Sequence, residues 1–414
     1  MNTDKTTGTP HPGLSFAGFV TLMAGFMALN GLAVDTMLPA LPAIGEELNV
    51  ADPNDRQWVI TAYFLGFGLF QLFYGPLSDR YGRRPVLLLG VSIYAVFSIC
   101  TVFASTFDGV VMTRFLQGAG SAATRVLVVA IVRDCYSGRQ MARVMSLAFI
   151  IFLTVPVLAP AIGQGVMLFV SWHWIFLGLA LFAMGLAVFA WMRLPETLDP
   201  EHRLPLSMGR VLQAFKVVAT TRNSIGYTIA MTLVLGPLFG YISSVQQIFA
   251  DVFDVEALFT VYFAITAISM AMASFLNSRI VERLGTRMVS HSALCSMLIL
   301  ALLGLLVEQT GHQSLYSFVA LQSAMMFCFG LTAPNFGSMA MEPVGHIAGT
   351  ASSVQGCVTT VGAAVLGFLI GQAFNGSTVP LIGAFALFSA TAIGVVLLTE
   401  GRMFRALHES PVAE

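Results

Sequence analysis

The chain has 414 residues, of which 57% are hydrophobic and only 10% are charged, and its formal net charge at pH 7 is −1. A soluble domain of this size would need roughly 25% charged residues to cover its surface, so the composition excludes a soluble globular protein and predicts a chain solvated by lipid. The sequence also lacks a dense basic patch, which argues against nucleic-acid binding.

Hydrophobic stretches of about 20 residues recur along the chain, and this length crosses roughly 30 Å of hydrocarbon at 1.5 Å per residue. Six of them precede a polar interval and six follow it, at about 14–40, 57–77, 84–104, 107–132, 144–169 and 172–193, then 222–249, 257–280, 288–307, 314–340, 348–373 and 378–399. The sequence therefore predicts an all-α membrane protein with twelve transmembrane helices in two pseudo-symmetric six-helix bundles.

The polar interval divides the chain into domains. We expect an amphipathic surface helix within it, at about residues 208–218. The expected domains are a cytoplasmic tail at 1–13, an N-terminal six-helix bundle at 14–193, a cytoplasmic linker at 194–221, a C-terminal six-helix bundle at 222–400 and a cytoplasmic tail at 401–414.

The basic residues are distributed unevenly between the two sides of these spans. If both termini lie on one side, that side holds 17 of the 20 lysines and arginines, and the loops of the other side hold only Arg56. Basic loops are retained in the cytoplasm. We therefore expect a multi-pass protein of the cell inner (plasma) membrane with both termini cytoplasmic.

A short basic loop recurs at half the chain length. Residues 75–84 read Gly-Pro-Leu-Ser-Asp-Arg-Tyr-Gly-Arg-Arg, and the pattern acid-Arg-x-Gly-x-Arg returns at residues 282–287, which is 203 positions after residues 79–84. Because each copy lies between long hydrophobic stretches, the repeat indicates two related bundles.

We interpret this loop as a cytoplasmic latch, a salt-bridge network that holds helix ends together in one state and opens in another. The arginines could instead be topology anchors, but that explains only their sign and not the accompanying acid and glycines. Thr286 replaces one arginine in the second copy, where we expect a weaker latch. The predicted latch residues are Gly75, Asp79, Arg80, Gly82, Arg83, Arg84, Asp134, Glu282, Arg283 and Arg287.

Three charges lie inside the predicted spans: Asp35, Arg114 and Arg125. A charge there costs at least about 2.5–3.5 kcal/mol and is by default a functional candidate. Asp35 and Arg114 lie at matching depth and could pair, although Asp35 could also sit at the headgroup boundary and Arg114 could join two helices. Arg125, about 16 Å deeper along the same face, either lines a cavity or extends to the cytoplasmic surface.

Other side chains suggest where a carrier would bend and bind. Pro156, Pro160, Gly163 and Gly165 lie in the fifth span, where prolines bend helices and glycines allow close contact. A substrate pocket should be apolar and aromatic with few polar groups. The candidates for its lining are Met27, Asn30, Tyr63, Gln117, Arg125, Tyr241, Gln246, Asn335 and Gln355.

Three motifs resemble those of the major facilitator superfamily. The loop 75–84 resembles the signature between its second and third helices, and residues 114–120, Arg-Phe-Leu-Gln-Gly-Ala-Gly, resemble its fourth-helix motif. Residues 35–42, Asp-Thr-Met-Leu-Pro-Ala-Leu-Pro, resemble the end of the first helix in drug/proton antiporters of the bicyclomycin/chloramphenicol-resistance type. Residues 156–165 resemble the antiporter motif only in part, because Ala159 replaces a glycine and Gln164 interrupts a glycine pair.

The resemblance implies proton-coupled efflux of small, mostly lipophilic compounds by alternating access, from a monomer. The sequence contains no Gly-Lys dipeptide, so it carries no phosphate-binding Walker loop and an ion gradient remains as the energy source. Competition between a proton and the substrate at Asp35, assisted by Arg114, would then give exchange. The alternative is a metabolite carrier on the same fold, importing or exporting a sugar, amino acid or organic acid, possibly a symporter.

Other classes of protein are disfavoured. A channel would need a continuous polar pore, and an intramembrane enzyme would need paired carboxylates, a metal cluster or an activated nucleophile within the spans. The five cysteines are scattered and the seven histidines have no ligand spacing, so we expect no metal and no cofactor. The expected partners are a small-molecule substrate, protons and the lipid bilayer.

Overall fold

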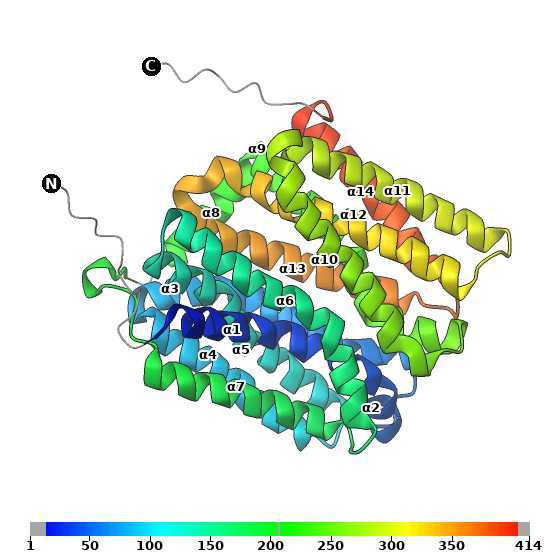
Figure 1. Cartoon of the computed structure of the whole chain (residues 1–414), viewed down its shortest axis with the longest axis horizontal. Coiled ribbons are helices and arrows are strands. Elements are labelled where there is room, and N and C mark those ends of the chain that lie inside the picture. The colour runs from blue at the N-terminus through cyan, green and yellow to red at the C-terminus, as the bar shows by residue number, and fades with distance from the viewer. Residues whose placement is uncertain (1–13, 206–207, 405–414) are drawn as a thin grey trace. The chain divides into compact units, whose positions relative to one another are not determined.

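The computed structural model describes residues 14–205 and 208–404. The predicted tail at 1–13 and the last ten residues, with Lys5 and Arg405, lie outside the described residues. In the described part of the chain every regular element is helical (Figure 1), and twelve helices are long and apolar enough to cross a membrane. The predicted all-α fold with twelve membrane-spanning helices is thereby confirmed.

The chain divides into two compact units, residues 1–213 and 214–414. The first contains α1 (Phe16–Asp35), α2 (Leu41–Glu47), α3 (Trp58–Tyr81), α4 (Arg83–Val102), α5 (Phe107–Cys135), α6 (Gly138–Met167) and α7 (His173–Arg193). The helix α8 (Met208–Thr220) spans the division. The second unit continues with α9 (Arg222–Gln247), α10 (Phe259–Leu284), α11 (Thr286–Gln309), α12 (Leu315–Met341), α13 (Ala348–Gln372) and α14 (Val379–Glu400).

The first helix ends earlier than the hydrophobic stretch suggested. Its last residue is Asp35, and the chain continues through a 3-10 turn, Leu38–Ala40, into the short α2. Pro39 and Pro42 explain the break, because proline lacks the N–H that would continue the helix and favours the first positions of a new one. Asp35 therefore lies at a helix end.

Glycines allow the helices of each unit to meet backbone against backbone. A Cβ at Gly118 of α5 would lie 2.0 Å from the Tyr63 carbonyl oxygen of α3. A Cβ at Gly367 of α13 would lie 2.9 Å from the Gly240 nitrogen of α9. Small residues at such crossings are typical of membrane helix packing, because close approach gains dispersion contacts.

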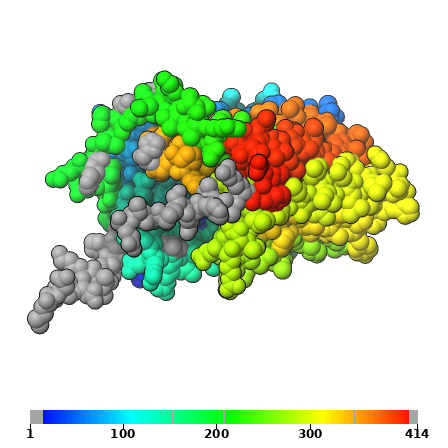
Figure 2. All heavy atoms as spheres, turned by 90° about the horizontal axis from the view of Figure 1, so that it is seen from above, coloured from blue at the N-terminus to red at the C-terminus, as the bar shows by residue number. Residues whose placement is uncertain are grey.

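The segment after α7 lies on the surface, where Figure 2 shows it in green. It is nevertheless tied to the first unit, since the Leu204 N–H donates to the carbonyl oxygen of Asp79 at 3.0 Å. This bond satisfies one of the carbonyl groups that the end of α3 leaves free.

Candidate functional site

Asp35, the last residue of α1, is a buried acid. Its residue is 5% exposed, and no described residue donates a hydrogen bond to its carboxyl group or forms an ion pair with it. An isolated buried carboxylate is strongly disfavoured. The Asp35 carboxyl group is therefore suited to hold a proton or to bind a solute.

The fifth-span motif packs directly against this end of α1. Ala28 of α1 forms one small apolar cluster with Val155 and Ala159 of α6. One turn further on, a Cβ at Gly163 would lie 1.8 Å from the Thr36 carbonyl oxygen, whereas a Cβ at Gly165 would meet nothing within 4 Å. The motif thus places Gly163, but not Gly165, against the residue that follows Asp35.

Arg114 of α5 is fully buried and bonded within the first unit. Its Nε donates to the Val59 carbonyl oxygen at 3.1 Å and its Nη1 donates to Gln117 Oε1 at 2.5 Å. The guanidinium carbon lies 4.5 Å from the centre of the Tyr63 ring, a cation–π contact. Its Nη2 has no partner in the described part of the chain.

The suggested pairing of Asp35 with Arg114 is not present in this structure, because the guanidinium is held by α3 and by its own helix. Polar contacts still connect their surroundings. Gln117 Nε2 donates to Ser98 Oγ at 2.6 Å, and Tyr63 Oη donates to Asn30 Oδ1 at 2.8 Å. Three of the predicted residues, Asn30, Tyr63 and Gln117, therefore join α1, α3, α4 and α5 around Arg114.

The remaining first-unit candidates differ in burial. Arg125 lies in the middle of α5 with an exposed side chain, in contrast to the buried Arg114 eleven residues earlier. Met27 is half-buried on α1. Pro156 and Pro160 lie inside α6, which continues through both.

The second-unit candidates are all buried, but each bonds to different neighbours. Tyr241 Oη lies 2.9 Å from Thr266 Oγ1, and Asn335 Nδ2 donates to Asn277 Oδ1 at 2.8 Å. Gln355 Nε2 donates to Ser224 Oγ and to the Ala340 carbonyl oxygen, both at 2.9 Å. These contacts, and the buried Gln246, do not form one shared polar cluster among the described residues.

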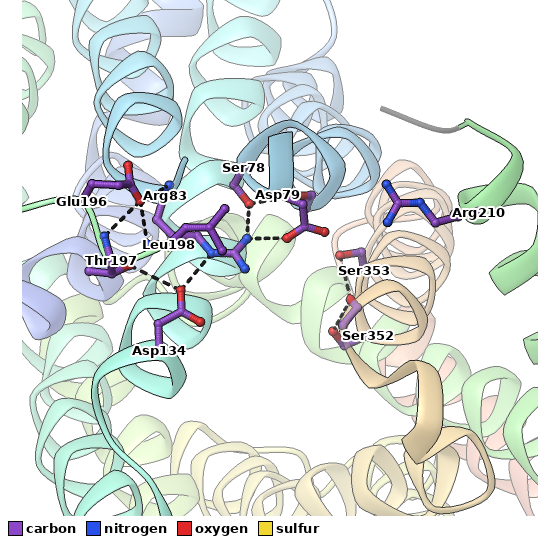
Figure 3. A network of polar contacts seen from close by, with 12 residues as sticks. Ser78, Asp79, Arg83, Asp134, Glu196, Thr197, Leu198, Arg210, Ser352 and Ser353 are labelled. Carbon is purple, nitrogen blue, oxygen red and sulfur yellow. Dashed lines mark hydrogen bonds and ion pairs between the residues drawn. The ribbon is translucent and has the colours of Figure 1, made fainter. Parts of the chain in front are cut away.

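The first copy of the basic loop forms what we call the first arginine cluster: Ser78, Asp79, Arg83, Asp134 and Glu196 (Figure 3). Arg83 Nη1 donates to Ser78 Oγ at 2.7 Å and to Asp79 Oδ1 at 2.6 Å, and Arg83 Nε donates to Asp134 Oδ2 at 3.0 Å. The Arg83 side chain is only 6% exposed. The cluster thus joins the ends of α3, α4 and α5.

Glu196, just after α7, is one of the residues that the sequence interpretation missed. Its carboxylate accepts the backbone N–H groups of Arg83 at 2.8 Å and Arg84 at 3.2 Å, so it caps the start of α4 from another part of the chain. A Cβ at Gly82, where φ is +102°, would lie 2.3 Å from its Oε2 atom. In the sequence, the only indication of this role was the position of Glu196 about one turn after the end of a predicted span.

The other predicted latch residues of the first copy lie around this cluster. The carbonyl oxygen of Gly75 accepts a bond from Ser78 Oγ at 2.8 Å. Arg84 donates through its guanidinium to the Trp191 carbonyl oxygen at the end of α7. Arg80 is exposed and stacks on the ring of Tyr81.

The second copy forms a different network, which we call the second arginine cluster: Tyr227, Arg287, His291, Glu342 and Glu400. Arg287 Nε donates to Glu400 Oε1 at 2.6 Å, and Arg287 Nη2 lies 3.8 Å from Glu342 Oε2. Tyr227 Oη also donates to Glu400 Oε1, at 2.7 Å. Glu282 and Arg283 are exposed and form no ion pair within the described residues, so the expected role of Glu282 as the counterpart of Asp79 is not seen here.

Two units of membrane-spanning helices, related basic loops and a buried acid inside a span are features of a secondary transporter. The family model described as the Major Facilitator Superfamily matches residues 15–367. The chain belongs to this superfamily, as its motifs predicted, and it is therefore a multi-pass membrane transporter rather than an enzyme.

Relatives at about 29% identity are named for drug resistance. The "Bicyclomycin resistance protein homolog" of Haemophilus influenzae is 29% identical over 91% of this chain and 94% of its own length. The "Chloramphenicol resistance protein" of Pseudomonas aeruginosa is 29% identical over 92% of this chain and 90% of its own. "Multidrug resistance protein D" of Escherichia coli is 28% identical over 83% and 86%.

Solved structures share the fold. A D-xylose–proton symporter superposes with a TM-score of 0.72 at 13% identity and covers 94% of this chain and 100% of its own. The human organic anion transporter MFSD10 superposes with a TM-score of 0.64 at 20% identity and covers 93% and 99%. At these identities the likeness concerns the fold alone.

Proposed function

We propose that this chain exports small, mostly lipophilic compounds in exchange for protons, by alternating access. The observation that carries the proposal is the buried Asp35 carboxyl group, to which no described residue offers a hydrogen bond. The relatives named for bicyclomycin, chloramphenicol and multidrug resistance support the choice of cargo. Proton coupling is consistent with the family.

The exchange follows from the physics of the Asp35 site. A neutral, protonated carboxyl group is compatible with a dry environment, whereas the carboxylate needs water or a polar or cationic group of the cargo beside it. Proton and cargo therefore exclude each other. A proton taken up from the outer side and released inward would leave the site ready to bind cargo from the cytoplasmic side.

Arg114 has a positioning role in this proposal. Its contacts with Val59 and Gln117 fix the positive charge within the first unit, and its unpartnered Nη2 leaves one N–H group for a solute or water. Asn30, Tyr63 and Gln117 then form the polar part of a substrate site, with Met27 and Arg125 at its border. In the second unit, Tyr241, Gln246, Asn335 and Gln355 stay predicted cargo contacts on the strength of the sequence.

The orientation and domain plan complete the proposal. We infer that the arginine-rich ends of the spans face the cytoplasm of the cell, with both termini on that side of the inner membrane. The functional bundles are then 14–193 and 222–400, joined by the cytoplasmic linker 194–221, and the protein acts as a monomer. The two arginine clusters are latches that must loosen when helix ends separate.

The deciding experiment compares wild type with Asp35→Asn in proteoliposomes with an imposed pH gradient. Asparagine keeps the size but cannot exchange a proton, so gradient-driven ethidium transport should be lost while expression and folding persist. Gly165→Ala is the matched control, because a methyl group there meets nothing within 4 Å. Full gradient-driven transport by Asp35→Asn would refute the mechanism.

The second candidate is a carrier of an anionic metabolite, favoured by the exposed charge of Arg125 in the middle of α5. Accumulation of labelled ethidium, chloramphenicol and organic acids in cells with and without the gene separates the two functions. Drug export requires lower accumulation of the first two compounds. A change confined to the organic acids, abolished by Arg125→Gln, would support the metabolite carrier instead.

A further inference from the structure

The exposed face of α10 is a continuous apolar stripe that ends in two arginines. Side chains three or four residues apart share one face of a helix, and the exposed residues along this face are Val261, Ile265, Ile268, Met272, Phe275 and Leu276. Arg279 and Arg283 follow at the same spacing and are exposed. The face therefore changes from apolar to cationic within one helical turn.

Neither arginine is neutralised by a carboxylate in the described part of the chain. Arg279 stacks on the Phe275 ring at 5.0 Å, and within the described residues no carboxylate lies within ion-pair distance of Arg279 or Arg283. Glu282 is the only acid in α10, and it forms no ion pair with either arginine in the described part of the chain. Two unpaired guanidinium groups at the end of an apolar face are complementary to a lipid with an anionic headgroup and apolar acyl chains.

The two arginines also border an open hollow at the end of α10. The hollow has a volume of about 410 Å³ and is lined by Arg279, Ile280, Arg283 and Leu284. The two arginines lie one helical turn apart, and so do the two apolar residues beside them. A guanidinium pair is suited to a phosphate group, which it can contact through several N–H donors.

The two copies of the repeat support the same conclusion. In the first copy the place beside Gly82 is filled by the Glu196 carboxylate, which lies 2.3 Å from where a Cβ would be. In the second copy Gly285 has the same kind of backbone, with φ +82°, but nothing lies within 4 Å of its Cβ position. The position of Arg279 corresponds to Pro76 in the first copy, so the arginine pair is particular to the second.

We propose that the end of α10 binds the phosphate headgroup of an anionic phospholipid, with Arg279 and Arg283 contacting the phosphate and the apolar stripe contacting the acyl chains. Clusters of basic residues at the ends of membrane helices are known to attract acidic lipid headgroups. The inference concerns a lipid site and does not depend on the transported cargo or on proton coupling.

The test measures lipid retention by the purified full-length protein in detergent, using native mass spectrometry. The probes are phosphatidylglycerol and phosphatidylcholine with identical acyl chains, and inorganic phosphate at the same concentration. We expect wild type to bind phosphatidylglycerol more tightly than phosphatidylcholine. Arg279→Gln combined with Arg283→Gln should weaken phosphatidylglycerol binding about thirtyfold, because two basic contacts to the headgroup are lost together.

Two control pairs keep the test specific. Arg139→Gln with Arg143→Gln removes two exposed arginines at the same spacing from α6 and should leave the affinity unchanged. Arg279→Lys with Arg283→Lys keeps both charges and should retain most of the binding.

Three results would overturn the proposal. One is an equal loss of phosphatidylglycerol in the α6 pair, which would mean a general charge effect. Another is equal binding of phosphatidylcholine and phosphatidylglycerol by wild type. The third is full displacement of the lipid by inorganic phosphate, which would mean a site for the free anion.

Discussion

The two arginine clusters occupy corresponding turns of one internal repeat, yet they neutralise their acids in different ways. In the first cluster the Arg83 side chain binds two acids while Glu196 accepts backbone N–H groups. In the second cluster Thr286 replaces Arg83, and Arg287 binds Glu400 and Glu342 through its side chain. The repeat thus preserves the backbone turn, while one substitution moves the charge pairing to the next arginine.

The difference has a structural consequence for the helices. The first cluster ties together α3, α4, α5 and the segment after α7, and it includes a capped helix start. The second ties together α9, α11, α14 and the end of α12, with no side-chain acceptor among the described residues for the first N–H groups of α11. We therefore expect substitutions in the first cluster to destabilise the protein more than substitutions in the second.

The largest expected effect is that of Arg83→Gln. Loss of the Arg83 guanidinium leaves Asp79 and Asp134 without the cation that they share. Breaking such a largely buried ion-pair group should lower the free energy of unfolding by about 3 kcal/mol. Unfolding titrated with sodium dodecyl sulfate in mixed micelles measures it. Arg80→Gln, an exposed arginine in the same loop, is the control and should unfold like wild type.

A smaller loss is expected for Glu196→Ala, which removes the cap of α4. The carboxylate accepts N–H groups of Arg83, Arg84, Thr197 and Leu198, and hydrogen bonds to a charged group contribute about 1.5–3 kcal/mol. We expect about 2 kcal/mol in the same titration and faster hydrogen exchange in the first turn of α4. An unchanged exchange rate in that turn would contradict the capping role.

Arg83 was predicted from the sequence as a latch residue, whereas Glu196 was not. The twelve spans and the superfamily followed from hydrophobic length and from the loop 75–84, because lipid forces each span to satisfy its backbone internally. The acids Glu196 and Glu400 could not be assigned, since their partners are distant in the chain and the repeat at 282–287 pointed to Glu282 instead. The Arg114 contacts with Val59 and Tyr63 likewise depend on helix packing that spacing alone does not define.

Alanine at the two corresponding glycines sharpens the comparison. Both glycines combine positive φ with ψ of 158° at Gly82 and 150° at Gly285, a region that essentially only glycine adopts, so each substitution should cost about 1–3 kcal/mol in backbone strain. Gly82→Ala must in addition displace Glu196, whereas Gly285→Ala meets nothing within 4 Å. Gly82→Ala should therefore destabilise more in the mixed-micelle titration. In the Glu196→Ala background, Gly82→Ala and Gly285→Ala should lower the free energy of unfolding equally. Equal losses for the two substitutions in the wild-type background would contradict the difference in the surroundings of the two glycines.

The smallest effect is expected for Glu282→Gln, which should not change the free energy of unfolding. Glu282 aligns with Asp79 in the repeat, but it is exposed and forms no ion pair among the described residues, because Arg287 is already held by Glu400 at 2.6 Å. Its substitution should leave unfolding unchanged, whereas Asp79→Asn should weaken the first cluster by removing one acid from Arg83. A loss for Glu282→Gln as large as that for Asp79→Asn would mean that both copies use the loop acid, and the asymmetry between the clusters would be wrong.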